Sequence, residues 1–395
     1  MNKEFSAIRI KGMGTSIFST MSRLAFENHA VNLGQGFPDF DGPLWLMEEA
    51  FNAMKEGKNQ YAPTQGILSL RKAISEMQKK YYGLDWNPET EITITAGATE
   101  ALYSTFQALI NEGDEVIMFE PFYDSYQADV ILAGGIPKYV TLKKPDFHFD
   151  FDELEHTITD KTKIIVINTP HNPTGKVYTI EELKLIAQLA VKHDLLVISD
   201  EVYEFLTFDN SKHIPIASLP GMKDRTVTIS SAGKTFSMTG WKIGWAISCS
   251  KLTDAIRKVH QWTTFAVNTP GQHAIAHAFS RLDEYLPVFQ KEYLERRDLL
   301  LKELKTTSFN AHIPKGSYFM MVDIPELNTM SGVTPDIDYD EEIAIELVKN
   351  YKIATIPPSV FYGKSDEGRT MLRLCFAKSN ETLIAGAENL RKYKI

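Results

Sequence analysis

The sequence predicts an α/β protein with a mostly parallel central sheet covered by helices on both faces, and with a smaller α+β part beside it. Short, continuously apolar segments alternate with helix-like segments through the middle of the chain, which is typical of parallel strands buried on both faces. After about residue 250, long polar–apolar helices dominate instead. The length of 395 residues allows about two or three domains. We expect a large domain of residues 31–270 and a small domain of residues 1–30 and 271–395.

The strands expected in the large domain are short and apolar, and most are followed by a helix. The expected strands are residues 91–96, 115–119, 163–168, 195–199, 226–230 and 243–248. Helices are expected at residues 99–109, from about 122, and at 180–192. The last helix is the best defined, because Thr179 and Glu182 form a capping box at its start. An open parallel sheet binds ligands beyond the carboxyl ends of its strands, so the residues that follow these strands are the first candidates for a site.

The small domain is expected to combine helices with two strands. Its expected helices are residues 284–304, 341–350 and 381–392, and its strands are residues 316–323 and 370–376. Residues 328–340 are rich in Thr, Ser, Gly, Pro and Asp, which predicts an exposed loop. The short N-terminal segment is expected to pack on this domain.

The composition excludes several classes of function. The formal net charge is −9, which argues against nucleic-acid binding and against an anionic membrane surface. No apolar run approaches membrane-spanning length, and no apolar stretch follows the first charges as in a signal peptide. Cys249 and Cys375 are far apart and indicate neither a metal site nor a disulfide framework. We expect a cytoplasmic protein that binds no metal, no nucleic acid and no membrane.

The most informative segment is residues 230–245, where Lys234 stands in a turn of small residues between Ser231 and Lys242. Small residues let the backbone approach a cofactor closely, and the hydroxyl and the second cation can hold phosphate oxygens. The Lys234 amine is then placed to form a Schiff base with an aldehyde. A lone lysine is normally exposed and solvated. This interpretation therefore depends on further elements that fit the same site.

Residues 230–245 resemble the cofactor-lysine motif of the class I aminotransferases, which use pyridoxal 5′-phosphate (PLP). Further segments extend the resemblance over nearly the full chain: residues 35–41, 59–63, 95–101, 172–175, 199–203, 233–242 and 373–378. The resemblance implies the type I fold of PLP transferases, with PLP bound to the large domain. Within the class, the chain is most similar to the branch of methionine aminotransferases and kynurenine–oxoglutarate transaminases. Many class members have arginine where Lys242 stands, and lysine grips a phosphate less directionally, but this branch also carries lysine there.

Asp200 follows a buried strand and begins a run that ends at Tyr203. In a PLP site, a carboxylate that faces the pyridine nitrogen keeps that nitrogen protonated, so that the ring accepts electrons when the substrate loses its α proton. Tyr203 is placed to donate to the phenolic oxygen of the ring. The alternatives are a helix N-cap for Asp200 and core packing for Tyr203.

Three further elements are expected to hold the cofactor. Asn172 lies in an Asn-Pro-Thr-Gly turn, and its amide would hold the same phenolic oxygen. Gly97, Ala98 and Thr99 can present free backbone amides to a phosphate at the start of a helix, unless this is an ordinary capped helix start. Tyr123 is placed to stack on the ring, and the alternative is a buried core aromatic.

Arg373 is the expected anchor of the substrate. It stands alone between apolar strand residues, and a buried guanidinium requires an acidic partner. That partner would be the α-carboxylate of the substrate, held by two parallel hydrogen bonds, or else a carboxylate of the protein itself. Gly36 would add a backbone amide to the substrate carboxylate, and Asn172 would contact it too, unless the segment around Gly36 is a simple turn.

The resemblance also implies a homodimer with each active site at the subunit interface. In that arrangement Tyr61 reaches the cofactor phosphate of the partner. From the residues alone, Tyr61 has no chemistry that can be read, and a loop tyrosine is more often at a surface or an interface.

These residues predict transamination in ping-pong order, from an L-amino acid of the methionine, aromatic, kynurenine or glutamine type to a 2-oxo acid. Lys234 would take the α proton and return it, as base and then acid. A second hypothesis keeps PLP and predicts a cysteine-conjugate β-lyase, since the same residues serve. A third is a non-catalytic PLP-binding regulator, which is disfavoured because no DNA-binding segment precedes Gly34 and the chain is acidic.

Side-chain specificity is the least determined feature. An apolar or aromatic pocket has five candidate residues: Phe18, Phe37, Tyr103, Tyr123 and Phe265. Core packing is the default role for each of them.

Overall fold

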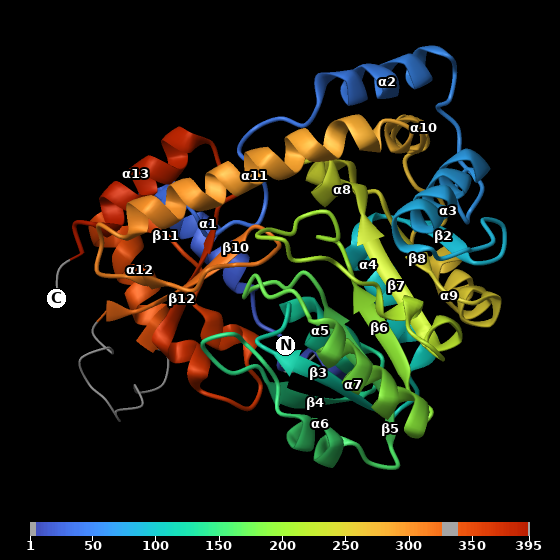
Figure 1. Ribbon diagram of the computed structural model, residues 1–395, viewed down its shortest axis with the longest axis horizontal. Helices are drawn as coiled ribbons and strands as arrows, with labels where there is room; N and C mark the ends of the chain where they lie inside the picture. Colours follow the sequence, from blue (N-terminus) through green and yellow to red (C-terminus); the bar gives the residue numbers. More distant parts are fainter. Residues whose placement is uncertain (1–4, 326–338, 394–395) are drawn as a thin grey trace.

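The computed structural model describes residues 5–325 and 339–393, and its centre is a seven-stranded sheet (Figure 1). The order of the strands across the sheet is β2, β8, β7, β6, β5, β3, β4. Their bounds are β2 (Ile92–Thr95), β3 (Glu115–Glu120), β4 (Ile136–Thr141), β5 (Thr162–Asn168), β6 (Leu196–Asp200), β7 (Thr226–Ser231) and β8 (Gly244–Ile247). All neighbours pair in parallel except at β8, which is antiparallel to both β7 and β2. The prediction of a mostly parallel sheet is confirmed.

Helices cover both faces of this sheet because the strands are apolar on both sides. Val116 and Met118 of β3 face a layer formed by α4 (Gly97–Leu109), α5 (Asp124–Leu132) and α9 (Ser250–Thr263). Their neighbours Ile117 and Phe119 point to the opposite face, which α6 (Phe151–Thr157) and α7 (Ile180–Lys192) cover. The predicted capping box begins α7, since the Thr179 hydroxyl accepts from the Glu182 amide and the Glu182 carboxylate accepts from the Thr179 amide.

The β2–β8 edge of the sheet packs in a second core with segments far away in the chain. Helices α2 (Leu44–Lys55), α3 (Leu68–Tyr82) and α10 (Thr269–Phe279) cover this edge, and α11 (Leu282–Leu304) runs on from it toward α13 (Figure 1). The short helix α8 (Ala232–Thr235) follows β7. This continuous core joins the edge of the sheet to the second group of elements.

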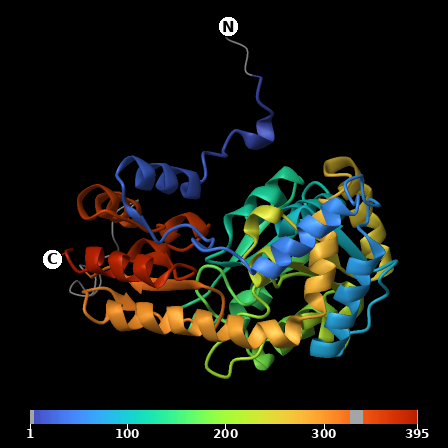
Figure 2. The same cartoon turned by 90° about the horizontal axis from the view of Figure 1, so that it is seen from above.

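A smaller group of strands and helices lies beside the large sheet (Figures 1 and 2). It has an antiparallel sheet of β9 (Asn310–Ala311), β10 (Phe319–Asp323) and β12 (Met371–Cys375), and a parallel pair of β1 (Val31–Asn32) and β11 (Ile353–Ala354). Helices α1 (Ile17–Glu27), α12 (Tyr339–Tyr351) and α13 (Asn380–Leu390) complete it. We keep the division at residues 30 and 270 as a proposal. The pairing of β1 with β11 ties residues 31–32 to the smaller group.

Most predicted elements are present with shifts of a few residues at their ends. The expected exposed loop at 328–340 lies largely outside the described residues, and its last two positions, Tyr339 and Asp340, begin α12. Within the described ranges, no helix combines the length and the hydropathy that crossing a bilayer requires. Cys249 and Cys375 are both free.

Candidate active site

A cavity of about 500 Å³ lies beyond the carboxyl ends of β5, β6 and β7, where the smaller group of elements meets the large sheet. Its lining includes almost all of the residues predicted from the sequence: Gly36, Gly97, Ala98, Thr99, Tyr123, Asn172, Asp200, Tyr203, Ser231, Lys234, Lys242 and Arg373. These residues are far apart in the sequence and come from both groups of elements. The predicted constellation is therefore assembled in one place.

Lys234 enters the cavity from α8, the short helix after β7. Ser231 caps that helix by accepting a hydrogen bond from the Gly233 amide at 3.2 Å. The Lys234 Nζ donates to the Tyr318 hydroxyl at 2.7 Å and to the Gly36 carbonyl at 3.3 Å. Burial lowers the pKa of the Lys234 amine to about 8. The fraction of this amine that is uncharged near neutral pH is therefore far greater than for an ordinary lysine, and the uncharged amine can act as a nucleophile or base.

The start of α4 forms a cradle for an anion. Its N-cap is Ala96, which has no side-chain oxygen to accept the first amides, and Gly97 adopts a φ of 76°. The alternative of an ordinary side-chain cap at this helix start is therefore wrong. A Cβ at Gly97 would lie 3.2 Å from the Lys242 Nζ, so the ammonium stands beside the free amides. The helix dipole, these amides and Lys242 all favour a phosphate here.

Asp200 ends β6 and is buried, with 4% of its surface exposed. The Tyr126 hydroxyl donates to its Oδ2 at 2.6 Å, and the Val202 amide donates to its Oδ1 at 3.3 Å. A turn follows Asp200, so the helix N-cap alternative is wrong. Burial raises the pKa of Asp200 to about 6, against the opposing effect of the Tyr126 bond. A cationic ring nitrogen placed against it would stabilise the carboxylate.

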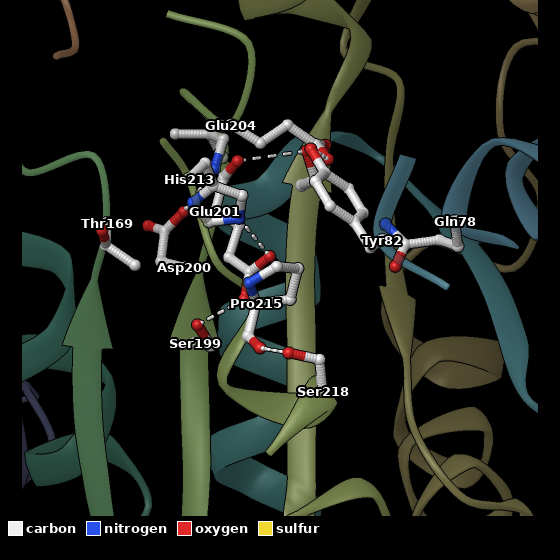
Figure 3. Close-up of polar contacts among 12 residues, drawn as sticks. Gln78, Tyr82, Thr169, Ser199, Asp200, Glu201, Glu204, His213, Pro215 and Ser218 are labelled. Carbon is white, nitrogen blue, oxygen red and sulfur yellow. Dashed lines mark hydrogen bonds and ion pairs between the residues drawn. The ribbon is translucent and has the colours of Figure 1, made fainter. Parts of the chain in front are cut away.

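The neighbours of Asp200 are also acidic, but their side chains form a separate network (Figure 3). The His213 Nε2 contacts the Glu201 carboxylate at 2.8 Å, and Tyr82 donates to Glu204 at 2.7 Å. Burial raises the pKa of Glu204 to about 7. Neither carboxylate lines the cavity, so Asp200 supplies the only carboxylate among the described lining residues.

Asn172 lines the cavity and is bonded to Arg373. Its Oδ1 accepts from the Arg373 NH1 at 2.9 Å, and its own backbone amide donates to the Asn168 Oδ1 at 2.7 Å. Because a guanidinium only donates, the side-chain oxygen of Asn172 must face Arg373. Its NH₂ group is then directed away from Arg373 and can donate to an oxygen such as the phenolate of PLP. Tyr203 is buried, and burial raises its pKa well above the ordinary value, so it stays a neutral donor.

Arg373 is 1% exposed and is held in place by bonds to neutral groups. Its NH2 donates to the Gly34 carbonyl at 2.7 Å, and three rings surround the guanidinium, with the nearest, Phe319, at 4.2 Å. Among the described residues no carboxylate forms an ion pair with it, and its Nε lacks a hydrogen-bond partner. The predicted alternative of an internal ion pair is therefore wrong. A buried cation without a counter-ion is suited to an anionic ligand.

The five aromatic candidates and Tyr61 separate into two groups, inside and outside the cavity lining. Phe18, Phe37 and Tyr123 line the cavity. Tyr61 and Phe265 lie outside it, with 82% and 50% of their surfaces exposed, and their rings contact each other edge to face at 5.4 Å between centroids. The fifth aromatic candidate, Tyr103, is also outside the described lining. Within the described residues, Tyr61 therefore does not reach the cavity of its own chain.

Three residues of the site were not predicted from the sequence: Tyr126 and Phe319 of the cavity lining, and Tyr318, which bonds to Lys234. Tyr126 lies one helical turn after Tyr123, and that spacing alone gave a signal that both face one side of α5. Phe319 begins β10 and Tyr318 immediately precedes it, and the apolar pattern of this segment is also that of a core strand, so nothing in the pattern distinguished them.

The residues present fit PLP by their own chemistry. The uncapped start of α4 with Lys242 suits a phosphate, Asp200 suits a protonated ring nitrogen, and Lys234 suits an aldehyde. Arg373, with its unpartnered Nε, suits the carboxylate of an amino acid.

Comparisons with known proteins agree with this chemistry. The family model for aminotransferase class I and II matches residues 28–390. A methionine aminotransferase of Escherichia coli is 40% identical over 97% of this chain and 97% of its own length. The kynurenine–oxoglutarate transaminase 3 of Homo sapiens is 40% identical over 99% of this chain and 90% of its own length.

Solved structures give the same result. The N-succinyldiaminopimelate aminotransferase of Mycobacterium tuberculosis superposes with a TM-score of 0.93 at 39% identity, covering 98% of this chain and 99% of that one. The chain belongs to the class I and II aminotransferases. It is a transaminase that depends on PLP, and the fold is the one predicted for this class.

Proposed function

We propose that this transaminase uses L-amino acids with uncharged side chains, of the methionine, aromatic, kynurenine or glutamine type, and a 2-oxo acid as acceptor. One observation carries the proposal. The described lining of the cavity contains three cations, Lys234, Lys242 and Arg373. The two lysines would serve the aldehyde and the phosphate of the cofactor, and Arg373 would bind the α-carboxylate that every amino acid carries. No described lining cation is left over for a second carboxylate, such as that of an aspartate side chain.

The remaining walls support the same choice. Phe18, Phe37 and Phe319 line the cavity, and Phe18 and Phe319 lie beside Arg373. They offer apolar contact to a thioether, an aliphatic chain or a ring. Ser19 and Ser22 of α1 and Gln35 after β1 are uncharged polar residues of the lining. An uncharged side chain loses little solvation energy in such a pocket, whereas a carboxylate would lose much.

The related proteins extend the argument to particular substrates. The relatives include a methionine aminotransferase and several kynurenine–oxoglutarate transaminases. We carry methionine and kynurenine to this chain as the first donors to test. An aspartate aminotransferase of Thermus thermophilus also shares the fold, at 32% identity and a TM-score of 0.88, so the fold alone does not decide the donor.

The residues of the chain divide the work of the reaction. Arg373 holds the α-carboxylate of the substrate through its fork of donors, and Asn172 fixes the orientation of that fork. Lys234 takes the proton from the α-carbon of the substrate and later returns it, because its lowered pKa allows both protonation states near neutral pH. PLP, when bound, supplies the aldehyde that takes up the amino group and the ring that withdraws electrons from the α-carbon.

The remaining polar residues hold the cofactor in register with Lys234. The amides of Gly97, Ala98 and Thr99, together with Ser231 and Lys242, would hold the phosphate. Asp200 would keep a proton on the ring nitrogen, and Tyr123 would stack on the ring. Asn172 and Tyr203 would donate to its phenolic oxygen. The cavity lining brings all of these groups within reach of one ligand.

A homodimer with shared active sites belongs to the same proposal. Tyr61 is exposed and its ring contacts the half-exposed ring of Phe265, which gives an aromatic surface left open to solvent within the described residues. The segment before α1 extends away from the body of the molecule in Figure 2, and it exposes Phe5 and Ile8. A second copy of the chain would cover both surfaces and bring Tyr61 to the phosphate in the opposite cavity. Two free cysteines and the acidic charge support a cytoplasmic location.

A donor panel tests the substrate proposal. We expect kcat/KM for methionine, phenylalanine, kynurenine or glutamine to exceed that for aspartate by about 100-fold, because an unpaired buried carboxylate costs several kcal/mol. Each donor is assayed with several 2-oxo acids as acceptors. Aspartate as the best donor would overturn the choice of substrate. In parallel, borohydride reduction should fix the cofactor on Lys234 in the wild type and nowhere in Lys234→Ala.

A further inference from the structure

The amine of Lys234 and the hydroxyl of Tyr318 are joined by a hydrogen bond that the sequence did not reveal. Lys234 Nζ donates to the Tyr318 oxygen at 2.7 Å. The Tyr318 hydroxyl in turn donates to the carbonyl of Gly36 at 2.5 Å. Lys234 also reaches that carbonyl, at 3.3 Å. The three groups thus form a closed triangle of hydrogen bonds at the wall of the cavity.

Tyr318 is fixed in place by its surroundings. It immediately precedes β10, and only 1% of its surface is exposed. Its ring contacts the rings of Tyr203 and Phe319 edge to face, at 4.9 and 4.8 Å between centroids, and stacks on Tyr293 at 6.2 Å. A hydroxyl on so constrained a ring has one position, so its bond can orient a flexible partner.

The direction of each hydrogen bond determines what the triangle does to the amine. A tyrosine hydroxyl has one proton, and that proton is committed to Gly36. Tyr318 therefore accepts from Lys234 and does not donate to the nitrogen lone pair. An uncharged amine with two N–H groups bound to Tyr318 and Gly36 keeps its lone pair free, on the side away from both acceptors.

We propose that Tyr318 is a positioning residue for Lys234, which holds the uncoupled amine by its N–H groups so that its lone pair faces the reacting carbon. This inference rests on the proposed role of Lys234 as the reacting amine. Tyr318 acts while the Lys234 amine has no covalent partner, which is before the cofactor is captured and again during proton transfer. In that interval a lysine side chain without a partner would sample many rotamers.

The triangle also links the amine to the substrate end of the cavity. Gly36 belongs to the loop after β1, and a Cβ there would lie 2.8 Å from the Phe319 ring, which packs against Arg373. Tyr318 fixes this loop and the lysine together. The reacting amine and the expected carboxylate site are thereby held at a constant separation.

The test compares the apoenzymes of wild type, Tyr318→Phe and Tyr293→Phe. Each is mixed with PLP, and capture is followed by absorbance in a stopped-flow instrument between pH 6 and pH 10. Capture forms a C=N bond between the Lys234 nitrogen and the aldehyde carbon and releases one water. Only the uncharged amine attacks, so the wild-type rate should rise with pH to a plateau, with a midpoint near 8.

Tyr318→Phe should change both features of this profile. The plateau rate should fall about tenfold, because the uncharged amine is no longer oriented. The midpoint should move down by about one pH unit, because an accepting oxygen stabilises an ammonium more than an amine. The substitution keeps the ring, and Lys234 still donates to the Gly36 carbonyl, so the variant should fold. Equal melting temperatures confirm this.

Tyr293→Phe is the matched control. Tyr293 is also 1% exposed and stacks on Tyr318, but its hydroxyl contacts Ser237 at 3.1 Å rather than Lys234. It should leave the plateau and the midpoint within about twofold and about 0.2 pH unit of the wild type, because its hydroxyl makes no bond to Lys234. An unchanged profile in Tyr318→Phe, or an equal change in both variants, overturns the inference. Absence of covalent capture in the wild type itself would instead contradict the role of Lys234.

Discussion

Gly244 of β8 lies directly against the backbone of Gly97 at the start of α4, so closely that a Cβ on Gly244 would come within 2.6 Å of the Gly97 carbonyl carbon. It would also lie 2.7 Å from the Ala98 nitrogen, one of the amides expected to hold the phosphate. The contact sets the distance between the cradle and Lys242, two residues before Gly244. Only glycine permits this approach.

Gly244→Ala should therefore weaken PLP binding. Overpacking costs about 1–3 kcal/mol, and if the cradle moves to relieve it, the Kd for PLP should rise by about tenfold or more. Titration of the apoenzyme with PLP measures this. Gly240→Ala is the control, because no described heavy atom outside its chain neighbours lies within 4 Å of a Cβ there. Equal Kd values for the two variants would show that the contact does not shape the cradle.

Asp200→Asn should lower kcat for the donor half-reaction by about 10²–10³, because a neutral amide does not hold a proton on the ring nitrogen. Rapid-mixing kinetics with methionine measure the step. Tyr126→Phe removes only the 2.6 Å bond to the Asp200 carboxylate and should cost about tenfold, the value of one hydrogen bond to a charged group. Loss of a hydrogen bond that favours the charged form should also raise the pKa of Asp200 further above about 6. A wild-type rate in Asp200→Asn would remove Asp200 from the mechanism.

Arg373→Lys should raise KM for the amino donor by about 10–100-fold with a smaller change in kcat, because a point charge replaces a fork that binds a carboxylate with two bonds. Steady-state kinetics at a saturating 2-oxo acid concentration separate the two constants. Arg369→Lys is the matched control, since Arg369 pairs with Asp366 at 2.9 Å and does not line the cavity. The prediction fails if both variants have the same KM.

His260 should make stability depend on pH. Its Nδ1 faces the Glu100 carboxylate at 2.9 Å and its Nε2 faces the Thr64 carbonyl at 2.7 Å, so both nitrogens must carry protons. Burial lowers the pKa of His260, but the bond and charge of Glu100 outweigh burial and leave the pKa above its ordinary value. A raised pKa in the folded state gives stability that is complete below the unfolded pKa of about 6.5 and is lost as pH rises through the folded value.

Comparison with His260→Gln isolates this contribution. The wild type should be more stable than the variant by about 3 kcal/mol at pH 6, because removing one partner of a buried pair leaves the other unpaired. The difference should shrink as the pH increases toward 9. Urea unfolding at several pH values measures it. A constant difference over this range would mean that His260 is uncharged in the folded protein.

The sequence was sufficient for the central sheet and for most of the site, and the reason is local. Strand β5 is apolar on both faces, and α7, which a capping box begins, follows it in the chain. Such an order of a buried strand and a helix predicts a parallel sheet without any tertiary information. Asn172, Asp200 and Lys234 were found because each follows such a strand, and the edge of a parallel sheet brings strand ends together.

The residues that were missed act through contacts that no local pattern encodes. Tyr318 meets Lys234, 84 positions away in the sequence, only because the chain that enters β10 passes the cavity. The strands β1 and β11, of two residues each, are too short to carry a period. The place of Tyr61 was predicted from the family resemblance alone. A single chain leaves it exposed, so its role stays a prediction until the partner is seen.

The antiparallel pairing of β7 and β8 places Ser231 directly opposite Gly244. The residues between them form one connection, which carries both Lys234, the proposed covalent anchor, and Lys242, the proposed phosphate ligand. The spacing of the two lysines is therefore set by loop length, not by docking between separate parts. Evolution or an engineer can exchange side chains within this connection, but adding or deleting a single residue would shift one lysine relative to the other and disable both at once.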